Sequence, residues 1–245
     1  MRTYIDNREL GGKNLSEGLG KVKIPLTILT YNRPEYLYKT LESFFRLNYD
    51  CIDNFIPILL NQGDSEPVKE VLKDFKEYID IYIEKENKGC AWGYSYLMDK
   101  FLDYPYVMHL QDDWYSTEPL THYLDQIYWV LEGNPSVGYV RLRSSQSKVY
   151  TINGVSDEKI VYRRWPKRYT FSRILVGNSH FTLNPTIVRS EVLKHILPIT
   201  KERDAMEKYH ELGLQAAQLK ANCFNHIGVE RAFTPGRGER KLWIK

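Results

Sequence analysis

The sequence predicts an α/β fold, in which a mostly parallel, mixed sheet carries helices on both faces of a single domain. Two observations predict it. Short apolar runs rich in β-formers alternate with apolar stripes at helical spacing, and no segment repeats. Alternation of this kind gives parallel strands joined by right-handed crossovers, a Rossmann-like arrangement. The length of 245 residues, 42% of them hydrophobic, suits one globular domain.

The elements follow one another regularly up to residue 142. Residues 25–30 read as a buried strand, and Pro34 suits the first turn of the helix that follows. The predicted strands are 25–30, 55–60, 79–84, 106–110 and 137–142, and the helices between them carry apolar stripes within 37–45, 68–75, 91–102 and 120–131.

The pattern loosens in the second half of the chain. Residues 148–173 read as a hairpin or irregular strands, and 178–197 as a strand, a turn at Asn184 and Pro185, and a helix. A further helix is predicted from Asp204 to Leu212 and a last strand within 218–228. We expect a leader over 1–23, the folded domain over 24–233, and a flexible basic tail over 234–245.

Composition excludes several classes of protein. The 34 Lys and Arg residues exceed the 31 Asp and Glu residues by three, too little to require a polyanionic partner. Neither a transmembrane-length apolar run nor a signal-peptide core is visible, so we expect a cytoplasmic protein. Cys51, Cys90 and Cys223 lack zinc or redox spacing, and we expect buried free thiols.

Common nucleotide and hydrolase motifs are missing. The first strand is followed by TYNRPEYL rather than GxGxxG, and neither GxxxxGK[ST] nor GxSxG occurs. A dehydrogenase, a P-loop enzyme and an α/β-hydrolase are therefore disfavoured. Polar residues nevertheless follow each of the first four predicted strands, at the edge where such sheets bind ligands. These residues are Asn32, Arg33, Gln62, Asp64, Glu84, Glu86, Asn87, Asp112 and Asp113.

The sharpest feature is HLQDDW, where Asp112 and Asp113 follow an apolar strand. Adjacent carboxylates repel each other unless a cation or hydrogen-bond donors compensate, so the pair suggests a hard divalent metal. A solvated turn is the alternative interpretation.

Five segments in order resemble the family 2-like, nucleotide-sugar-dependent glycosyltransferases of the GT-A fold. They are PLTILTYNRPEYLYKTLESF, NKGCAWGYSYLM, HLQDDW, LNPTIVRSEVL and FNHIG, and they span roughly residues 24–230. The resemblance implies a nucleotide-binding half over about 24–115 and an acceptor-side half over about 116–233. It also implies a metal-dependent, inverting transfer of a sugar from a nucleoside diphosphate, with a UDP-sugar favoured, to an acceptor hydroxyl.

The resemblance also implies donor contacts. The segment after the first strand would wrap base and ribose, Asp64 would meet the base, and Asn87 with Gly89 would approach nucleotide and sugar. Simple turns and helix caps explain the same residues, with Asn32 capping the helix that Pro34 begins. The implied donor-binding residues are Thr30, Tyr31, Asn32, Arg33, Asp64, Asn87, Gly89, Gln111 and Asp112.

LQDDW resembles the family's DXD-type metal motif, with Gln111 at a position that is often acidic. The resemblance implies that Asp113 ligates Mn²⁺ or Mg²⁺ and that Asp112 binds donor-sugar or ribose hydroxyls. Gln111 would then contribute hydrogen bonds without charge. His226 matches a late histidine that reaches the metal or the diphosphate, and a structural histidine is the alternative.

Inverting transfer needs a carboxylate base opposite the leaving group. The match to the family's acidic helix start favours Glu207, while Asp204 is either the base or a helix cap. Ordinary solvated helix charges explain both residues equally simply.

The acceptor is open. The stretch from Arg141 to Arg173 is basic and aromatic, and it suits a diphosphate, an anionic glycan or nucleic acid such as a hydroxymethylated DNA base. A solvated basic hairpin is the alternative. Two further functions stay open for the whole chain: a sugar nucleotidyltransferase, although the glycine-rich basic loop after the first strand is lacking, and a non-catalytic nucleotide-sugar-binding protein.

Overall fold

The computed structural model describes residues 22–143, 169–171, 174–177, 181–219, 221–228, 232–234 and 238–240. Its strands are β1 (Ile24–Thr30), β2 (Phe55–Asn61), β3 (Ile81–Glu84), β4 (Tyr106–Gln111), β5 (Trp114–Ser116), β6 (Val137–Arg141), β7 (Tyr169–Phe171), β8 (Ile174–Gly177), β9 (Thr186–Arg189), β10 (Gln215–Leu219), β11 (Phe224–His226), β12 (Ala232–Thr234) and β13 (Gly238–Arg240). Its helices are α1 (Pro34–Leu47), α2 (Glu66–Asp74), α3 (Cys90–Asp99), α4 (Leu124–Gly133), α5 (Ser190–Ile196) and α6 (Glu202–Glu211), with short 3-10 helices η3 (Tyr49–Asn54) and η4 (Leu120–His122).

One sheet organises the molecule. Its strand order is β3-β2-β1-β4-β9-β6-β10-β8-β7. Strands β9 and β8 run antiparallel to their neighbours, and all the other strands of this sheet point the same way. This confirms the predicted α/β fold with a mostly parallel, mixed sheet. Because β2, β1 and β4 are parallel, with Thr30 opposite Asn61 and Leu29 opposite Gln111, their carboxyl ends meet at one edge.

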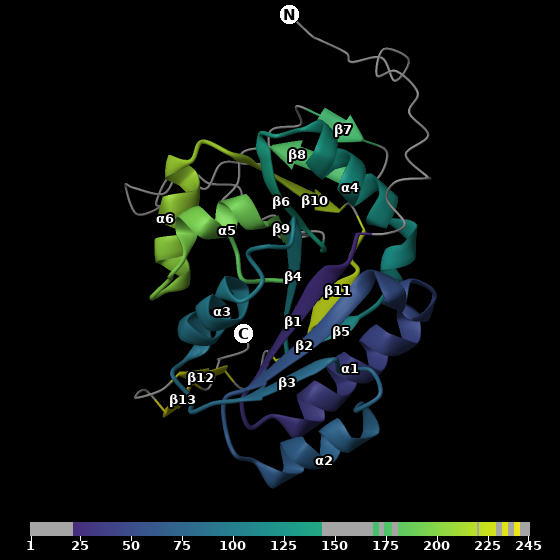
Figure 1. Cartoon of the computed structure of the whole chain (residues 1–245), viewed down its shortest axis with the longest axis vertical. Coiled ribbons are helices and arrows are strands. Elements are labelled where there is room, and N and C mark those ends of the chain that lie inside the picture. Colours follow the sequence, from purple (N-terminus) through teal and green to yellow (C-terminus); the bar gives the residue numbers. More distant parts are fainter. Residues whose placement is uncertain are drawn as a thin grey trace, which may run out of the picture.

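Helices cover both faces of this sheet, as predicted (Figure 1). The helices α1, α2 and α4 pack on one face, and α3, α5 and α6 pack on the other. Side chains along β1 point alternately to the two faces of the sheet. Ile28 therefore packs in the core under α1, α2 and α4, and Leu29 in the core under α3, α5 and α6. In α1 the proline stands in the first turn and the stripe containing Leu41 and Phe44 is fully buried.

The second half corrects several details. The strand near residues 178–197 is β9, which follows the turn at Asn184 and Pro185 instead of preceding it. The predicted last strand is two strands, since β10 joins the main sheet and β11 pairs with the unpredicted β5. Helix α6 begins at Glu202, two residues before the predicted start. These pairings join distant segments, which local periodicity does not encode.

Other predictions fall largely outside the described residues. The described end of the 148–173 segment forms β7, which pairs antiparallel with β8 as a hairpin would. The leader lies outside except for residues 22 and 23. Within the predicted tail over 234–245, residues 238–240 form β13 against β12, and the flexibility of the tail stays a prediction.

Among the described residues, one histidine is buried in the core. His109 on β4 is 0% exposed, and its Nδ1 lies 3.0 Å from the Thr27 hydroxyl, which itself donates to the Met108 carbonyl. The Tyr94 ring packs edge-on at 4.8 Å. Burial lowers the pKa of His109 from 6.5 to about 3, so the ring is neutral at pH 7.

This histidine should make stability depend on pH. Its pKa is lower in the folded state, so stability is present above pH 6.5 and is lost as the pH falls from 6.5 towards 3. Between pH 7 and pH 5 the wild type should lose about 2 kcal/mol more unfolding free energy than His109→Gln does. Urea unfolding of both proteins at the two pH values checks this, and parallel pH profiles would contradict it.

Candidate active site

A cleft of about 270 Å³ opens at the carboxyl ends of β1 and β4. The start of α3 and the segment after β11 complete its wall. It is lined by Leu29, Thr30, Tyr31, Arg33, Gln62, Asn87, Gly89, Cys90, Gln111, Asp112, Asp113, His226 and Gly228. The sheet edge predicted from the sequence is therefore hollowed, and it gathers most of the predicted donor and metal residues.

Backbone hydrogen bonds fix the turn that carries the two carboxylates. The Asp112 amide donates to the Leu29 carbonyl at 3.0 Å, and the Thr40 hydroxyl donates to the Asp112 carbonyl at 2.8 Å. The Ile227 amide donates to the Asp113 carbonyl at 2.9 Å. The turn is thus tied to β1, α1 and the end of β11, and its aspartates are buried instead of solvated.

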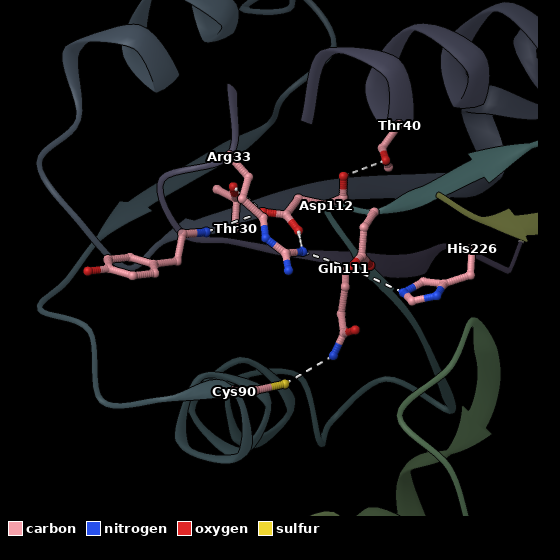
Figure 2. Close-up of polar contacts among 9 residues, drawn as sticks. Thr30, Arg33, Thr40, Cys90, Gln111, Asp112 and His226 are labelled. Carbon is pink, nitrogen blue, oxygen red and sulfur yellow. Dashed lines mark hydrogen bonds and ion pairs between the residues drawn. The ribbon is translucent and has the colours of Figure 1, made fainter. Parts of the chain in front are cut away.

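Arg33 connects both aspartates through one nitrogen (Figure 2). Its Nη1 lies 2.7 Å from Asp113 Oδ2 and 3.1 Å from Asp112 Oδ1. The second oxygen of Asp112 accepts hydrogen bonds from the Thr30 hydroxyl at 2.8 Å and the Tyr31 amide at 3.3 Å. Every oxygen of the Asp112 carboxyl therefore has a donor.

The two aspartates differ in acidity. Burial, opposed by Arg33, raises the pKa of Asp112 from 3.8 to about 6. Burial also favours the neutral form of Asp113, but the hydrogen bond and charge of His226, with those of Arg33, outweigh it and lower the pKa of that carboxyl. Asp113 is therefore the more strongly ionised member of the pair.

His226 and Gly228 approach Asp113 from the end of β11. The His226 Nε2 lies 3.2 Å from Asp113 Oδ2, and its ring packs on Trp114 at 4.7 Å. The backbone of residue 228 comes so close that a Cβ there would lie 2.3 Å from Asp113 Oδ2. His226 thus contacts Asp113, and its approach to a metal or a diphosphate, which the resemblance implied, stays a prediction.

Gly228→Ala should therefore be destabilising. The added methyl would also lie 2.6 Å from the Asp113 Cβ, and this buried side chain must shift to admit it. Overpacking of this kind costs about 1–3 kcal/mol of unfolding free energy. Urea unfolding measures the loss, with Gly133→Ala as the matched control because its Cβ would meet nothing within 4 Å. Equal stability of the two variants would contradict the close approach.

The wall opposite the aspartates comes from the segment before α3. The side chain of Gln62, 2% exposed, accepts from the Lys88 amide and donates to the Gly89 carbonyl, each at 3.2 Å. The Asn87 side chain accepts from the Gly89 amide at 2.9 Å. Gly89 has a φ of 90°, a conformation that favours glycine. From the sequence, Gln62 was expected at this sheet edge, but no role was predicted for it.

A contact between Gln111 and Cys90 links these two walls. The Gln111 Nε2 donates to Cys90 Sγ at 3.0 Å (Figure 2). Desolvation, followed by the charges of Glu202, Asp113 and Asp112, raises the pKa of Cys90 to about 12. Cys51 and Cys223 are buried free thiols as predicted, whereas Cys90 lines the cleft and is exposed, which corrects the prediction that it is buried.

Two predicted donor residues do not line the cleft. Asn32 has a φ of 48° and makes no cap, since the N-cap of α1 is Arg33 without a side-chain hydrogen bond. The capping role considered for Asn32 is therefore wrong. The Asp64 side chain is 76% exposed and pairs with Lys69. Contacts of Asn32 and Asp64 with a nucleotide stay predictions.

The two candidate bases on α6 have structural partners. The Asp204 carboxylate accepts hydrogen bonds from the Thr200 hydroxyl and the Lys201 amide, closing a capping box that lowers its pKa. Glu207 pairs with Arg203 at 3.1 Å. Neither residue lines the cleft. The structure thus gives Asp204 the capping role that the sequence had left as its alternative.

A third carboxylate, Glu202, stands at the first position of the same helix. Its Oε1 accepts from the Leu183 amide at 3.1 Å and the Thr182 hydroxyl at 3.4 Å. Glu202 does not itself line the cleft, but its charge contributes to the raised pKa of Cys90, which does. Sequence reasoning missed Glu202 because its contacts come from residues 182–183, and a local sequence pattern does not reveal contacts between separate segments.

One oxygen of Asp113 is suited to ligate a divalent cation. Asp113 Oδ1 is buried and has no hydrogen-bond partner among the described residues, although a buried carboxylate oxygen normally has one. Within that part of the chain, no three His, Cys, Asp or Glu side chains gather as a complete metal cluster. Any cation here would therefore rely on ligands from a bound substrate or water as well.

Comparisons with known proteins identify the fold. No protein-family model matches the sequence, and no curated protein is significantly similar to it. The mannosyltransferase PcManGT from Pyrobaculum calidifontis, in complex with GDP-Man and Mn²⁺, is similar in structure with a TM-score of 0.54 and 13% identity, over 79% of this chain and 53% of that chain. S. aureus TarS 1-349 in complex with UDP-GlcNAc has a TM-score of 0.55 and 14% identity, over 86% of this chain and 62% of that chain.

These similarities show that the chain has the GT-A fold of nucleotide-sugar glycosyltransferases, as the five sequence segments implied. It spans only 53% of PcManGT and 62% of the TarS fragment. None of the helices in the described ranges is long and apolar enough to cross a membrane.

Proposed function

We propose that this protein is a metal-dependent, inverting glycosyltransferase that moves a sugar from a nucleoside-diphosphate sugar to an acceptor hydroxyl. The observation that carries the proposal is the Asp112–Asp113 pair, buried in a cleft at the end of β4 of a GT-A fold. Structural neighbours in complex with GDP-Man and UDP-GlcNAc support this class of donor. A UDP-sugar stays our favoured donor.

The metal would be Mn²⁺ or Mg²⁺, held by Asp113 with His226 beside it. The partnerless Asp113 Oδ1 supports this, as does a neighbour that is a Mn²⁺ complex. Such a cation supplies Lewis-acid stabilisation of the charge that develops on a leaving diphosphate. His226 and Arg33 keep Asp113 ionised, which is the form that ligates metal.

The donor would lie along the cleft between β1 and the segment before α3. Thr30 and Tyr31 face it from the end of β1, and Asn87 with Gly89 face it from the opposite wall. Asp112 and Gln111 would contact the sugar or ribose hydroxyls, and Arg33 the phosphates. Asp64 and Asn32 would act only at the outer end, towards the base.

We place the catalytic base at Glu202 in preference to Glu207 or Asp204. Among the described residues, the hydrogen bonds to Glu202 both go to Oε1, and Oε2 would take the acceptor proton. Asp204 is occupied by its capping box, and Glu207 by Arg203.

The acceptor is a hydroxyl of a glycan or, as the narrower alternative, of a hydroxymethylated DNA base. The basic aromatic stretch that suggested nucleic acid lies mostly outside the described residues. Steeply salt-dependent DNA binding would favour the DNA alternative, and weak binding at low salt would exclude it.

Proton NMR of the reaction tests the proposal directly. The protein, Mn²⁺ and α-linked UDP-GlcNAc, UDP-glucose or GDP-mannose are mixed with simple glycosides or with water as acceptor. We expect the nucleoside diphosphate to be released and the first-formed sugar to have the inverted anomeric configuration. Retention would contradict the inverting mechanism, and pyrophosphate release from a nucleoside triphosphate and sugar phosphate would identify a nucleotidyltransferase instead.

A further inference from the structure

The Asp112–Asp113 pair already holds a cation that belongs to the chain. Arg33 Nη1 donates to both carboxylates, at 3.1 and 2.7 Å (Figure 2). A guanidinium next to two carboxylates supplies the positive charge that a divalent ion would otherwise provide. Arg33 therefore already occupies carboxylate oxygens of the proposed metal site.

Within the described part of the chain, one of the four carboxylate oxygens lacks a hydrogen-bond partner. Asp112 Oδ2 is used by Thr30 and Tyr31, while Asp112 Oδ1 and Asp113 Oδ2 are both used by Arg33. Asp113 Oδ1 has no partner among the described residues. Hard cations require several oxygen ligands, so an ion that takes Asp112 Oδ1 or Asp113 Oδ2 as a second carboxylate oxygen competes with Arg33 there, and at Asp113 Oδ2 also with His226.

The arginine is the more movable partner of this ion pair. The Arg33 side chain is 19% exposed, against 5% for Asp112 and 7% for Asp113, and it lines the same cleft. Its guanidinium lies 5.7 Å from the ring of Tyr36. The backbone bonds of the aspartate turn hold the carboxylates in place. An incoming cation would therefore displace Arg33 towards the cleft, where a donor diphosphate would offer the paired oxygens that arginine prefers.

We propose that Arg33 competes with the divalent cation for Asp112 and Asp113, and that the donor diphosphate accepts Arg33 when the cation displaces it. The inference rests on the proposed function, because it assumes a metal at Asp113. The consequence is regulatory. The metal alone binds the protein weakly, the protein with donor bound binds the metal more tightly, and the protein with metal bound binds the donor more tightly. The chain thereby avoids loading metal without donor.

Manganese binding without nucleotide tests the competition. Free Mn²⁺ is followed by electron paramagnetic resonance during titration of the wild type, Arg33→Gln and Arg46→Gln. We expect Arg33→Gln to bind Mn²⁺ about 10-fold more tightly than the wild type, within the usual range of coupling between ligands. Arg46→Gln is the matched control, since it removes the same charge from α1 at an exposed pair with Glu42. Equal or weaker Mn²⁺ binding by Arg33→Gln would overturn the inference.

Thermal stability gives a second readout if Arg33→Gln folds poorly. The variant leaves two buried carboxylates without their cation, so its Tm should fall, and Mn²⁺ should raise that Tm by more than it raises the Tm of the wild type. No greater rescue by Mn²⁺ would overturn the inference. Absence of Mn²⁺ binding from every variant would overturn it together with the metal assignment, whereas sugar transfer without Mn²⁺ in the same preparations would leave glycosyl transfer standing.

Discussion

Asp113→Asn is expected to reduce metal-dependent turnover of a nucleotide sugar by about 100- to 1000-fold, because stabilisation of the leaving diphosphate by a metal contributes several kcal/mol, and each 1.36 kcal/mol is tenfold in rate. The amide keeps the shape of the side chain but loses the charge that faces His226 and Arg33. Initial rates of nucleoside-diphosphate release at saturating donor, with and without Mn²⁺, measure the effect.

The fold of Asp113→Asn should be retained. The carboxylate sits at the end of a strand and is not part of the apolar core, and Asp112 remains to pair with Arg33. Circular dichroism checks the fold. Asp99→Asn, at the exposed end of α3, is the control and should keep the wild-type rate. Wild-type turnover by Asp113→Asn would reject the metal assignment.

Glu202→Gln should give the second large loss, about 100- to 10,000-fold in turnover, which is the usual contribution of general base catalysis. Glutamine still accepts hydrogen bonds from Leu183 and Thr182, so the start of α6 should be preserved. It cannot take a proton from an acceptor hydroxyl. Donor and Mn²⁺ affinities should therefore stay at wild-type values while the transfer rate falls.

Glu207→Gln and Asp204→Asn separate this assignment from the one suggested by sequence. Glu207 pairs with Arg203 on the exposed surface, so its variant should retain turnover. Asp204→Asn should lower the Tm modestly through the weakened capping box, again with turnover retained. Loss of turnover in Glu207→Gln, with Glu202→Gln spared, would return the base to Glu207.

The first half of the fold could be predicted because its determinants are local. The buried strand at 24–30 and the α1 stripe of Leu41 and Phe44 follow from composition and periodicity. The position of Asp112 and Asp113 followed from the same logic, since residues directly after parallel strands gather at one edge of the sheet. Their place in the cleft confirms that reasoning.

Other features depend on contacts between distant segments. Strand β9 enters antiparallel between β4 and β6, which a strand pattern alone does not specify. The backbone of Gly228 lies close to Asp113 because β11 pairs with β5 and brings the two residues together. Glu202 differs from Glu207 in its neighbours, not in its sequence pattern. The roles of Gly228 and Glu202 could be predicted only from the contacts between distant segments. Arg33 was recognised from the sequence, but its ion pair with both aspartates was not.

Thermal stability of the wild type and Asp113→Asn, against nucleoside diphosphates and nucleotide sugars with and without Mn²⁺, tests the central claim most directly. A ligand at about 100 times its Kd stabilises the native state by roughly 2.7 kcal/mol, which is readily measured. We predict a rise in Tm with one diphosphate and its sugar, UDP first, that requires Mn²⁺ and disappears in Asp113→Asn. Folded wild-type protein that shows no rise with any nucleotide and Mn²⁺ would contradict a metal-dependent nucleotide-sugar site.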